Sequence, residues 1–366
     1  MREILKGISR RDFIKCSASM AALLGLSELY IPQIAAALEK AAKKPAVLWL
    51  NGSGCTGCTV SLINSEHPTP AEIILDILSI RYMETIMAAS GHVAEKQFED
   101  IVHEGGYVFV MEGAIPTAEN GAYCMIGGRP VMEIAKEAAA NSVYNVAVGS
   151  CACYGGIPAA DPNPTGCKGL KDVVGGTVVN IPGCPAHPDW IVGTITHILL
   201  FGEVPELDEH GRPKMFYGKL IHENCQRRTG YELGNWVKNF GEEETEMDYC
   251  MGGKGCRGPV THADCPSRLW NSGTNYCIAA SAPCAGCVEP DFPDFKDADG
   301  KIISLYAPIP EVAKYKEALE AEVEHEEGMG AGTAAALGAV VGAAAGVAGG
   351  YAIGGKTKSE EKEGEE

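Results

Sequence analysis

The stretch that decides the fold is residues 46–58, Ala46-Val47-Leu48-Trp49-Leu50-Asn51-Gly52-Ser53-Gly54-Cys55-Thr56-Gly57-Cys58. Its first five residues form a short apolar run, which indicates a buried strand, and residues 51–54 carry the Asn and Gly of a turn. A Cys-x-x-Cys pair follows directly. The stretch therefore predicts a strand that delivers two thiols to its carboxyl end.

Three more apolar runs repeat this pattern along the chain, at residues 107–111, 145–149 and 177–181. Helical stretches such as residues 130–140 lie between them. Strands that alternate with helices predict an α/β fold with a parallel sheet covered on both faces. Ligands gather at the carboxyl ends of the strands in such sheets, and three of the four predicted strands run directly into a cysteine.

The regular pattern fades after about residue 205. Residues 222–293 are rich in Cys, Gly and Pro and show little periodicity. We expect such a segment to bury little apolar surface and to need internal cross-links, such as metal centres, to stabilise its fold. The sequence thus predicts two domains, residues 43–204 and 205–300, followed by a linker and charged helix over residues 301–327.

Composition narrows the classes of function. The chain has 366 residues, enough for one large domain or two smaller ones, and a net charge of −18. This acidic balance argues against a nucleic-acid partner, because phosphate binding needs clustered Lys and Arg. The 15 cysteines fall in short spacings within a long chain, which favours metal or cluster binding over a small disulfide scaffold.

The first cysteine group follows the predicted strands. Cys55 and Cys58 follow the first, Cys151 the third and Cys184 the fourth. Each iron of an iron–sulfur cubane takes one soft thiolate, so four thiols converging on one sheet edge suit one cluster. The alternative is a Cys-x-x-Cys redox disulfide, which leaves Cys151 and Cys184 unexplained.

Two further groups lie in the irregular segment. The second combines one histidine with three thiols and suits zinc as well as an iron–sulfur cluster, because both accept such ligands. The third ends in a Cys-x-x-Cys pair flanked by prolines and favours cluster chemistry. The second group is His222, Cys225, Cys250 and Cys256; the third is Cys265, Cys277, Cys284 and Cys287.

The remaining cysteines have no predicted ligand role. Cys16 lies in the N-terminal segment, while Cys124, Cys153 and Cys167 are expected to be small buried side chains. On an extended segment Cys151 and Cys153 would point to opposite faces, so both should not bind one cluster. Glu112 follows the second predicted strand and is expected to be a salt-bridge partner.

Residues 1–42 have the pattern of a targeting segment. Paired arginines at Arg10 and Arg11 precede an apolar run over residues 16–26, which is typical of a twin-arginine signal. The alternative is a chance basic start to a helix. Twin-arginine export carries folded proteins, which fits metal centres installed where thiols stay reduced.

The C-terminal end predicts a membrane anchor. Residues 328–355 carry no charge, and glycine recurs at every fourth position from Gly338 to Gly354. On a helix these glycines form one smooth face for close helix packing. The alternative is a flexible Gly/Ala linker. Residues 356–366 are rich in Lys and Glu and are predicted to be a disordered tail on the cytoplasmic side.

The ordered motifs resemble those of nickel–iron hydrogenase small subunits. The resemblance covers roughly residues 45–295, and the motifs occur in the order found in that family. They are Asn51-Gly52-x-x-Cys55-Thr56-Gly57-Cys58, Gly149-Ser150-Cys151, Ile181-Pro182-Gly183-Cys184-Pro185 with His187-Pro188-Asp189-Trp190, His222-Glu223-Asn224-Cys225, Gly255-Cys256-Arg257-Gly258-Pro259, Cys265-Pro266 and Pro283-Cys284-x-x-Cys287.

The resemblance implies a flavodoxin-like first domain and three clusters. A proximal 4Fe-4S cluster would be held by the first cysteine group, next to a separate large subunit. A medial cluster would be held by the third group and a distal 4Fe-4S cluster by the second, with His222 as one ligand. This implication favours iron–sulfur chemistry over zinc at the second group.

Two positions depart from the family pattern. Many relatives have a carboxylate two residues after the opening motif, where this chain has Val60. The side chain that could relay protons at this position is therefore absent. Many relatives have proline in the loop that carries Cys277, and their medial cluster has three irons. A thiolate at Cys277 would hold a fourth, making the cluster 4Fe-4S rather than 3Fe-4S.

The resemblance implies the electron-transferring small subunit of a membrane-associated uptake hydrogenase. The hydrogen-splitting site would lie on the large subunit of the heterodimer, so no catalytic residue is expected in this chain. Expected partners are that subunit and a membrane cytochrome b, at the periplasmic face of the cell membrane. The alternatives are an iron–sulfur subunit of a respiratory-type quinone reductase and a zinc- or disulfide-stabilised exported protein without activity.

Overall fold

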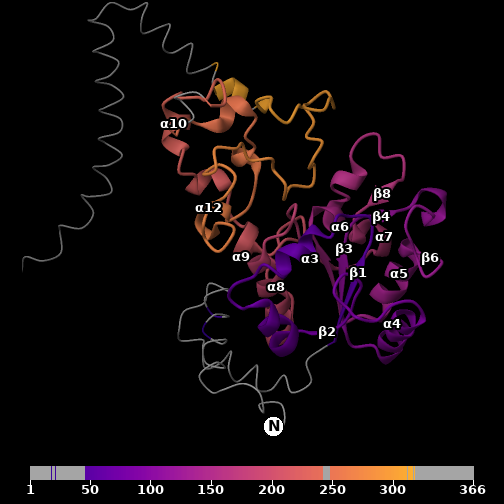
Figure 1. Ribbon diagram of the computed structural model, residues 1–366. Coiled ribbons are helices and arrows are strands. Elements are labelled where there is room, and N and C mark those ends of the chain that lie inside the picture. The colour runs from indigo at the N-terminus through magenta and orange to yellow at the C-terminus, as the bar shows by residue number, and fades with distance from the viewer. Residues whose placement is uncertain are drawn as a thin grey trace, which may run out of the picture. The chain divides into compact units, whose positions relative to one another are not determined.

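The computed structural model describes residues 18, 21, 46–241, 248–310, 312–315 and 317. The chain divides into one compact unit that ends at Ile309 and a second that begins at Pro310 (Figure 1). In the second unit, the described residues 310, 312–315 and 317 are helical. The predicted signal, the anchor over residues 328–355, the C-terminal tail and most of the charged helix lie outside the described residues.

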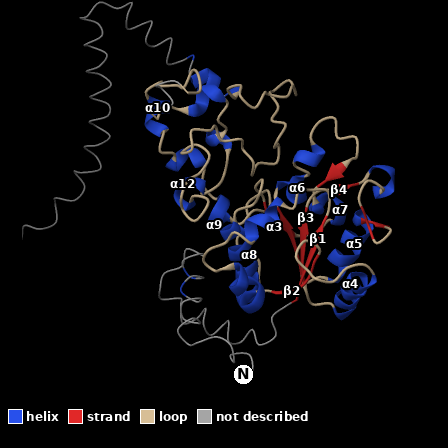
Figure 2. Cartoon of the chain, in the orientation of Figure 1, coloured by secondary structure: helices blue, strands red, loops and turns tan. Residues whose placement is uncertain are grey.

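Five parallel strands form the sheet of the first unit, in the order β2-β1-β3-β7-β9 (Figure 2). Numbered along the chain, this is 2-1-3-4-5, one of the two common doubly wound orders. The four predicted strands are confirmed, with ends that shift by one residue. The strands are β1 (Ala46–Asn51), β2 (Ser79–Met83), β3 (Val108–Glu112), β7 (Tyr144–Val148) and β9 (Val178–Ile181).

The sequence did not predict β2, which lies at one edge of the sheet. Its first three residues are only partly buried and include Arg81, so the strand lacks the continuous apolar run of its neighbours. Two small antiparallel pairs accompany the sheet, β4 (Ile115–Pro116) with β8 (Cys167–Lys168), and β5 (Met125–Ile126) with β6 (Arg129–Pro130).

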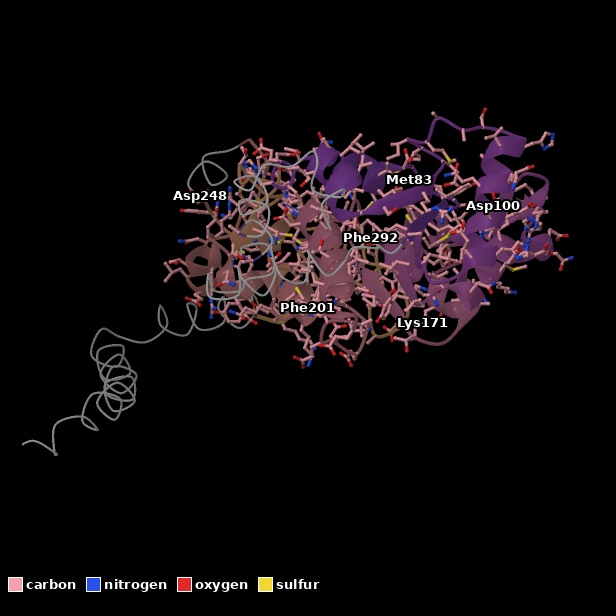
Figure 3. The ribbon with its side chains drawn as sticks, turned by 90° about the horizontal axis from the view of Figure 1, so that it is seen from below. Met83, Asp100, Lys171, Phe201, Asp248 and Phe292 are labelled. Carbon is pink, nitrogen blue, oxygen red and sulfur yellow. The ribbon has the colours of Figure 1, made fainter. Side chains whose placement is uncertain are left out.

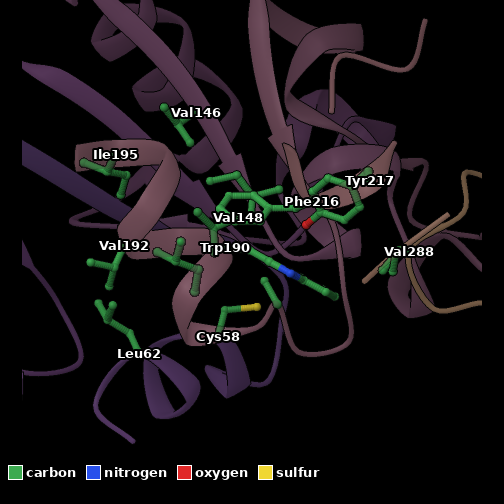
Figure 4. Packing of buried hydrophobic residues seen from close by; sticks show 14 of the residues in the cluster. Cys58, Leu62, Val146, Val148, Trp190, Val192, Ile195, Phe216, Tyr217 and Val288 are labelled. Carbon is green, nitrogen blue, oxygen red and sulfur yellow. The ribbon is translucent and has the colours of Figure 1, made fainter. Parts of the chain in front are cut away.

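Helices cover both faces of the sheet, as the alternating pattern predicts. Val146 and Val148 of β7 pack on one face with Trp190 of α8, whereas Ala147 faces the other core with Phe98 of α4. Figure 4 shows the first of these cores around Trp190. The first face carries α3 (Gly57–Leu62) and α8 (Pro188–Phe201); the second carries α4 (His92–Glu104), α5 (Val131–Asn141), α6 (Ser150–Tyr154) and α7 (Leu170–Val174).

The expectation that residues 222–293 bury little apolar surface is wrong. Val237, Met251, Ile278 and Val288 are almost fully buried and belong to the same core as α8. They are contributed singly by turns, so no periodic pattern indicates them. The short helical elements between residues 214 and 268 are α9 (Lys214–Tyr217), α10 (Arg228–Glu232) and α12 (Cys265–Arg268), with 3-10 turns η5 (Ile221–Asn224), η6 (Met251–Lys254) and η7 (Gly258–Val260).

Arg212 joins the loop between α8 and α9 to residues 288–289. The side chain is 2 % exposed and donates from Nε to Asp208 Oδ2 at 2.7 Å. Its Nη1 lies 3.0 Å from Glu289 Oε1 and 3.2 Å from the carbonyl oxygen of Val288. Because removing one partner of a buried ion pair strands the other charge, this contact strongly fixes where residues 288–289 lie.

Within the part of the chain that the structure describes, each helix is too short or too polar to span a lipid bilayer.

Glu84 is a half-buried residue that directly follows β2, at the carboxyl edge of the sheet. Its Oε2 accepts hydrogen bonds from the backbone N and the Nδ2 of Asn51, at 3.2 and 3.3 Å. Its Oε1 is buried and has no hydrogen-bond partner among the described residues. Burial raises the pKa of Glu84 to about 7, and the bonds from Asn51 only partly oppose this rise.

This raised pKa predicts a pH-dependent stability. The native state holds the Glu84 proton more tightly than the unfolded chain, so its contribution is complete below pH ~4.3 and lost as pH rises through about 7. Between pH 5 and 8 the loss should be about 2–3 kcal/mol. Glu84→Gln should remove this part of the pH dependence of urea unfolding. Glu99→Gln, on the exposed side of α4, is the control; an unchanged dependence in Glu84→Gln would refute the assignment.

Candidate metal centres

The first cysteine group gathers at the carboxyl edge of the sheet. Cys55 and Cys58 flank the start of α3, Cys151 lies in the first turn of α6, and Cys184 follows β9. Burial, together with the nearby Cys184 and Cys55, raises the pKa of Cys151 to about 11. Burial also raises the pKa of the Cys58 thiol, with added contributions from Glu112, Cys151 and Cys184. The four thiols therefore lie within electrostatic reach of one another.

Gly149 makes this close approach possible. It has φ of +84°, in the region that favours glycine, and a Cβ placed there would lie 2.4 Å from Cys58 Sγ. The turn after β7 can thus pass directly beside the Cys55-x-x-Cys58 turn. Any side chain at this position would displace one of the four thiols.

Glu112 holds the Cys55-x-x-Cys58 turn in place. Its side chain is buried, and its Oε1 accepts hydrogen bonds from the backbone N of Cys58 and Thr59 at 3.0 and 3.1 Å. Its Oε2 accepts from Trp49 Nε1 at 2.9 Å and from Thr59 Oγ1 at 2.5 Å. The expected salt bridge is replaced by four neutral donors, which sequence reasoning missed because three of them come from a distant loop.

The third group lines a single cavity of about 350 Å³. Its wall is otherwise largely apolar, and burial raises the pKa of Cys287 to about 12. Cys184 of the first group lines the same cavity. The wall includes Cys265, Cys277, Cys284 and Cys287, with Ile221, Trp270, Tyr276 and Val288 among their neighbours.

The second group lines a separate, smaller cavity. His222 belongs to η5, and its ring packs edge-on against Tyr231 at 4.5 Å between centroids. Burial raises the pKa of Cys250 to about 12 and that of Cys256 to about 11. Cys225 completes the set, and the backbone N of Gly252 donates to Cys250 Sγ at 3.3 Å.

The three groups adjoin in the order first, third, second. The first meets the third through Cys184, and also through Ser150, whose Oγ accepts from Gly183 N at 2.9 Å and donates to the carbonyl oxygen of Cys287. The third meets the second where the backbone N of Cys284 donates to Cys256 Sγ at 3.3 Å. All predicted site residues thus fall into one contiguous series.

The donor set suits iron–sulfur clusters. Buried thiols with raised pKa values need a nearby cation to become thiolates, and iron supplies that charge to soft ligands. Four thiols around one cavity can each reach a different iron. Among the described residues, no three His, Cys, Asp or Glu side chains converge on a point where one metal ion would sit.

The expectation of an extended segment at Cys151 and Cys153 is wrong, because both lie in helix α6. Cys153 is buried in the core on the α4 face, where its Sγ donates to the carbonyl oxygen of Ala147 at 3.4 Å. Cys167 is also buried, with its Sγ 3.2 Å from Thr165 Oγ1, and Cys124 is half-buried. The role of Gly149 was not predicted; the one sequence signal for it is its place in Gly149-Ser150-Cys151.

Two family models match the chain. Residues 55–198 match the family described as NADH ubiquinone oxidoreductase, 20 Kd subunit. Residues 217–298 match the family described as the C-terminal part of the NiFe/NiFeSe hydrogenase small subunit. The first match covers the sheet domain from the end of β1 onward, with the first cysteine group, and the second covers both remaining groups.

Curated relatives and solved structures agree with the second description. The periplasmic [NiFeSe] hydrogenase small subunit of Desulfomicrobium baculatum is 44% identical over 313 residues, 79% of this chain and 97% of that protein. The uptake hydrogenase small subunit of Azotobacter vinelandii is 39% identical, over 90% of this chain and 91% of that protein. The reduced, active Ni-Fe-Se hydrogenase structure from D. baculatum has a TM-score of 0.67 at 42% identity, covering 73% of this chain and 100% of that one. The chain belongs to the NiFe/NiFeSe hydrogenase small subunit family.

Proposed function

We propose that this chain is the electron-transferring small subunit of a nickel–iron hydrogenase, carrying electrons from a hydrogen-splitting large subunit to an external acceptor. The observation that supports it most is the contiguous series of three ligand groups. Electrons move between protein cofactors only over short distances, so the protein's task is to place and tune those cofactors. The similarity to hydrogenase small subunits supports a path that starts at a large subunit, and we propose that it runs from the first group through the third to the second.

We assign the groups to three iron–sulfur clusters, which would supply one-electron acceptors and donors. Cys55, Cys58, Cys151 and Cys184 would hold the proximal 4Fe-4S cluster, at the switch point of a flavodoxin-like sheet. Cys265, Cys277, Cys284 and Cys287 would hold the medial cluster, and His222, Cys225, Cys250 and Cys256 the distal one. Glu112 would keep the proximal turn rigid, and the Cys284 backbone would couple medial to distal ligands.

The quinone-reductase alternative is less well supported. Its family model ends at residue 198, and eight ligand candidates lie beyond that point, where the hydrogenase model matches. A disulfide-stabilised protein is also less favoured, because every cysteine among the described residues has a free thiol.

The chain ends support a membrane role. We propose that residues 1–42 act as a twin-arginine signal and residues 328–355 as a transmembrane anchor, which would place residues 43–300 at the periplasmic face. Two of the relatives named above are called periplasmic or uptake enzymes. A membrane cytochrome b would then be the electron acceptor beside the distal cluster.

His222→Ala tests the proposed function directly. It removes a ligand of the distal cluster while leaving the proximal one untouched, so hydrogen–deuterium exchange at the large subunit should be unchanged. Dye reduction by the heterodimer should fall by at least about tenfold, since even changes beside a metal ligand typically cost 10–100-fold. His92→Ala, on the exposed start of α4, is the control. Equal rates of dye reduction in both variants would contradict the distal assignment.

Cys277→Pro tests the number of irons in the medial cluster. Cys277 lines the same cavity as the other three medial thiols, so we expect a four-iron cluster. The proline variant should show a stoichiometric three-iron signal by EPR of the oxidised protein, because one thiolate is lost. Cys124→Ser, at a half-buried cysteine away from this cavity, should show none. A three-iron signal already present in the unmodified protein would refute the assignment.

Truncation after Glu327 tests the anchor. The shortened heterodimer should move from the membrane to the soluble fraction, because the uncharged segment over residues 328–355 is gone, and should remain active with dyes. Its electron transfer to quinone-type acceptors should be lost. If the full-length protein is already found in the soluble fraction without detergent, the segment is a linker rather than an anchor.

A further inference from the structure

Arg227 is a buried arginine, and one of its three side-chain nitrogens lacks a hydrogen-bond partner among the described residues. The side chain is 2 % exposed. Its Nη1 donates to the carbonyl oxygen of Tyr249 at 3.0 Å, and its Nη2 donates to Ser281 Oγ at 2.8 Å and pairs with Asp248 Oδ1 at 3.1 Å. Its Nε is buried and has no partner among the described residues. A buried donor without an acceptor costs about 1–3 kcal/mol, so its retention calls for an explanation.

The position of Arg227 explains why a buried donor without an acceptor is retained. It lines the small cavity of the second group, together with His222, Cys225, Cys250 and Cys256. Of the described residues that line this cavity, Arg227 is the one Lys or Arg. Its two terminal nitrogens contact Tyr249, Ser281 and Asp248, none of which lines the cavity. This leaves Nε as the part of the guanidinium available to an acceptor in the cavity.

The ion pair of Arg227 does not remove its field. Asp248 is 68% exposed, so water screens the carboxylate far more than it screens the buried guanidinium. Figure 3 shows Asp248 at the outer edge of the molecule, far from Met83 and Asp100 of the sheet domain. A planar, always-charged guanidinium is also the cation best suited to a buried site.

The next residue offers a contrast. Arg228 has a similarly placed charge, but its side chain is 49% exposed and pairs with Glu232 at 2.8 Å within α10. It does not line the cavity. Burial lowers the pKa of His222 and the charge of Arg228 adds to this, so Arg228 does act on the second group. Solvent and Glu232 nevertheless screen this exposed charge more than they would a buried one.

We propose that Nε of Arg227 donates a hydrogen bond to a sulfur of the distal iron–sulfur cluster and that the buried guanidinium raises the reduction potential of that cluster. The inference rests on the proposed function. Hydrogen bonds to the sulfurs and the net charge around a cluster set its potential. A donor and a positive charge stabilise the reduced, more negative state, so both effects act in the same direction. Arg227 is a tuning residue and not an iron ligand.

An EPR-monitored redox titration of the intact heterodimer tests the proposal with Arg227→Gln and Arg227→Lys. Arg227→Gln loses the charge and should shift the distal potential to more negative values. We expect at least a tenfold change in the electron's equilibrium constant, or about 59 mV for one electron. Arg227→Lys keeps the charge and should shift the potential less. Arg129→Gln, which removes an exposed charge paired with Glu137, should leave it unchanged.

A second measurement starts from the unmodified protein and does not need Arg227→Gln to assemble. Protein labelled only at arginine with nitrogen-15 should show a nitrogen hyperfine coupling at the reduced distal cluster, and Arg227→Lys should lose it. If the coupling is absent from the unmodified protein, or persists in Arg227→Lys, the proposal is overturned even where Arg227→Gln fails to assemble. A distal cluster that is present with an unchanged potential in Arg227→Gln overturns this inference alone. Absence of any distal cluster from the unmodified protein overturns the proposed function as well.

Discussion

The buried carboxylate of Glu112 is the contact on which the rest of the site depends. It ends the central strand β3, where it pairs in register with Asn51 of β1 and Val148 of β7. A buried charge is tolerated only when it is fully hydrogen-bonded, and here the donors come from Trp49 and from the turn that carries Cys58. The sheet and the turn that carries the first two cysteines are therefore fixed by the same group.

The second half of the unit has little regular structure and takes its position from the first. Ser150 ties the start of α6 to the Cys287 backbone, and Arg212 ties the loop between α8 and α9 to Glu289. Irregular backbone of this kind has few ladder hydrogen bonds to hold it. Cysteine loops that share a bound cluster would supply the missing constraint, since the free energy of metal binding is then also free energy of folding.

The sequence predicted the central strands and the convergence of Cys55, Cys151 and Cys184 because parallel strands leave continuous apolar runs and share one carboxyl edge. It missed β2, whose exposed edge gives no such run. The buried residues of the second half also escaped, because Met251 and Ile278 are contributed singly by turns. Hydrogen-bond roles such as that of Glu112 depend on partners more than fifty residues away, and no local pattern reports them.

The central claim is that three groups of four ligands hold three clusters in series. Mössbauer spectroscopy and iron analysis of the anaerobically purified, iron-57-enriched heterodimer test it most directly, once the iron of the large subunit is subtracted. The account predicts about 12 irons in this chain, as three four-iron clusters. About four irons, or bound zinc at the second group, would contradict it.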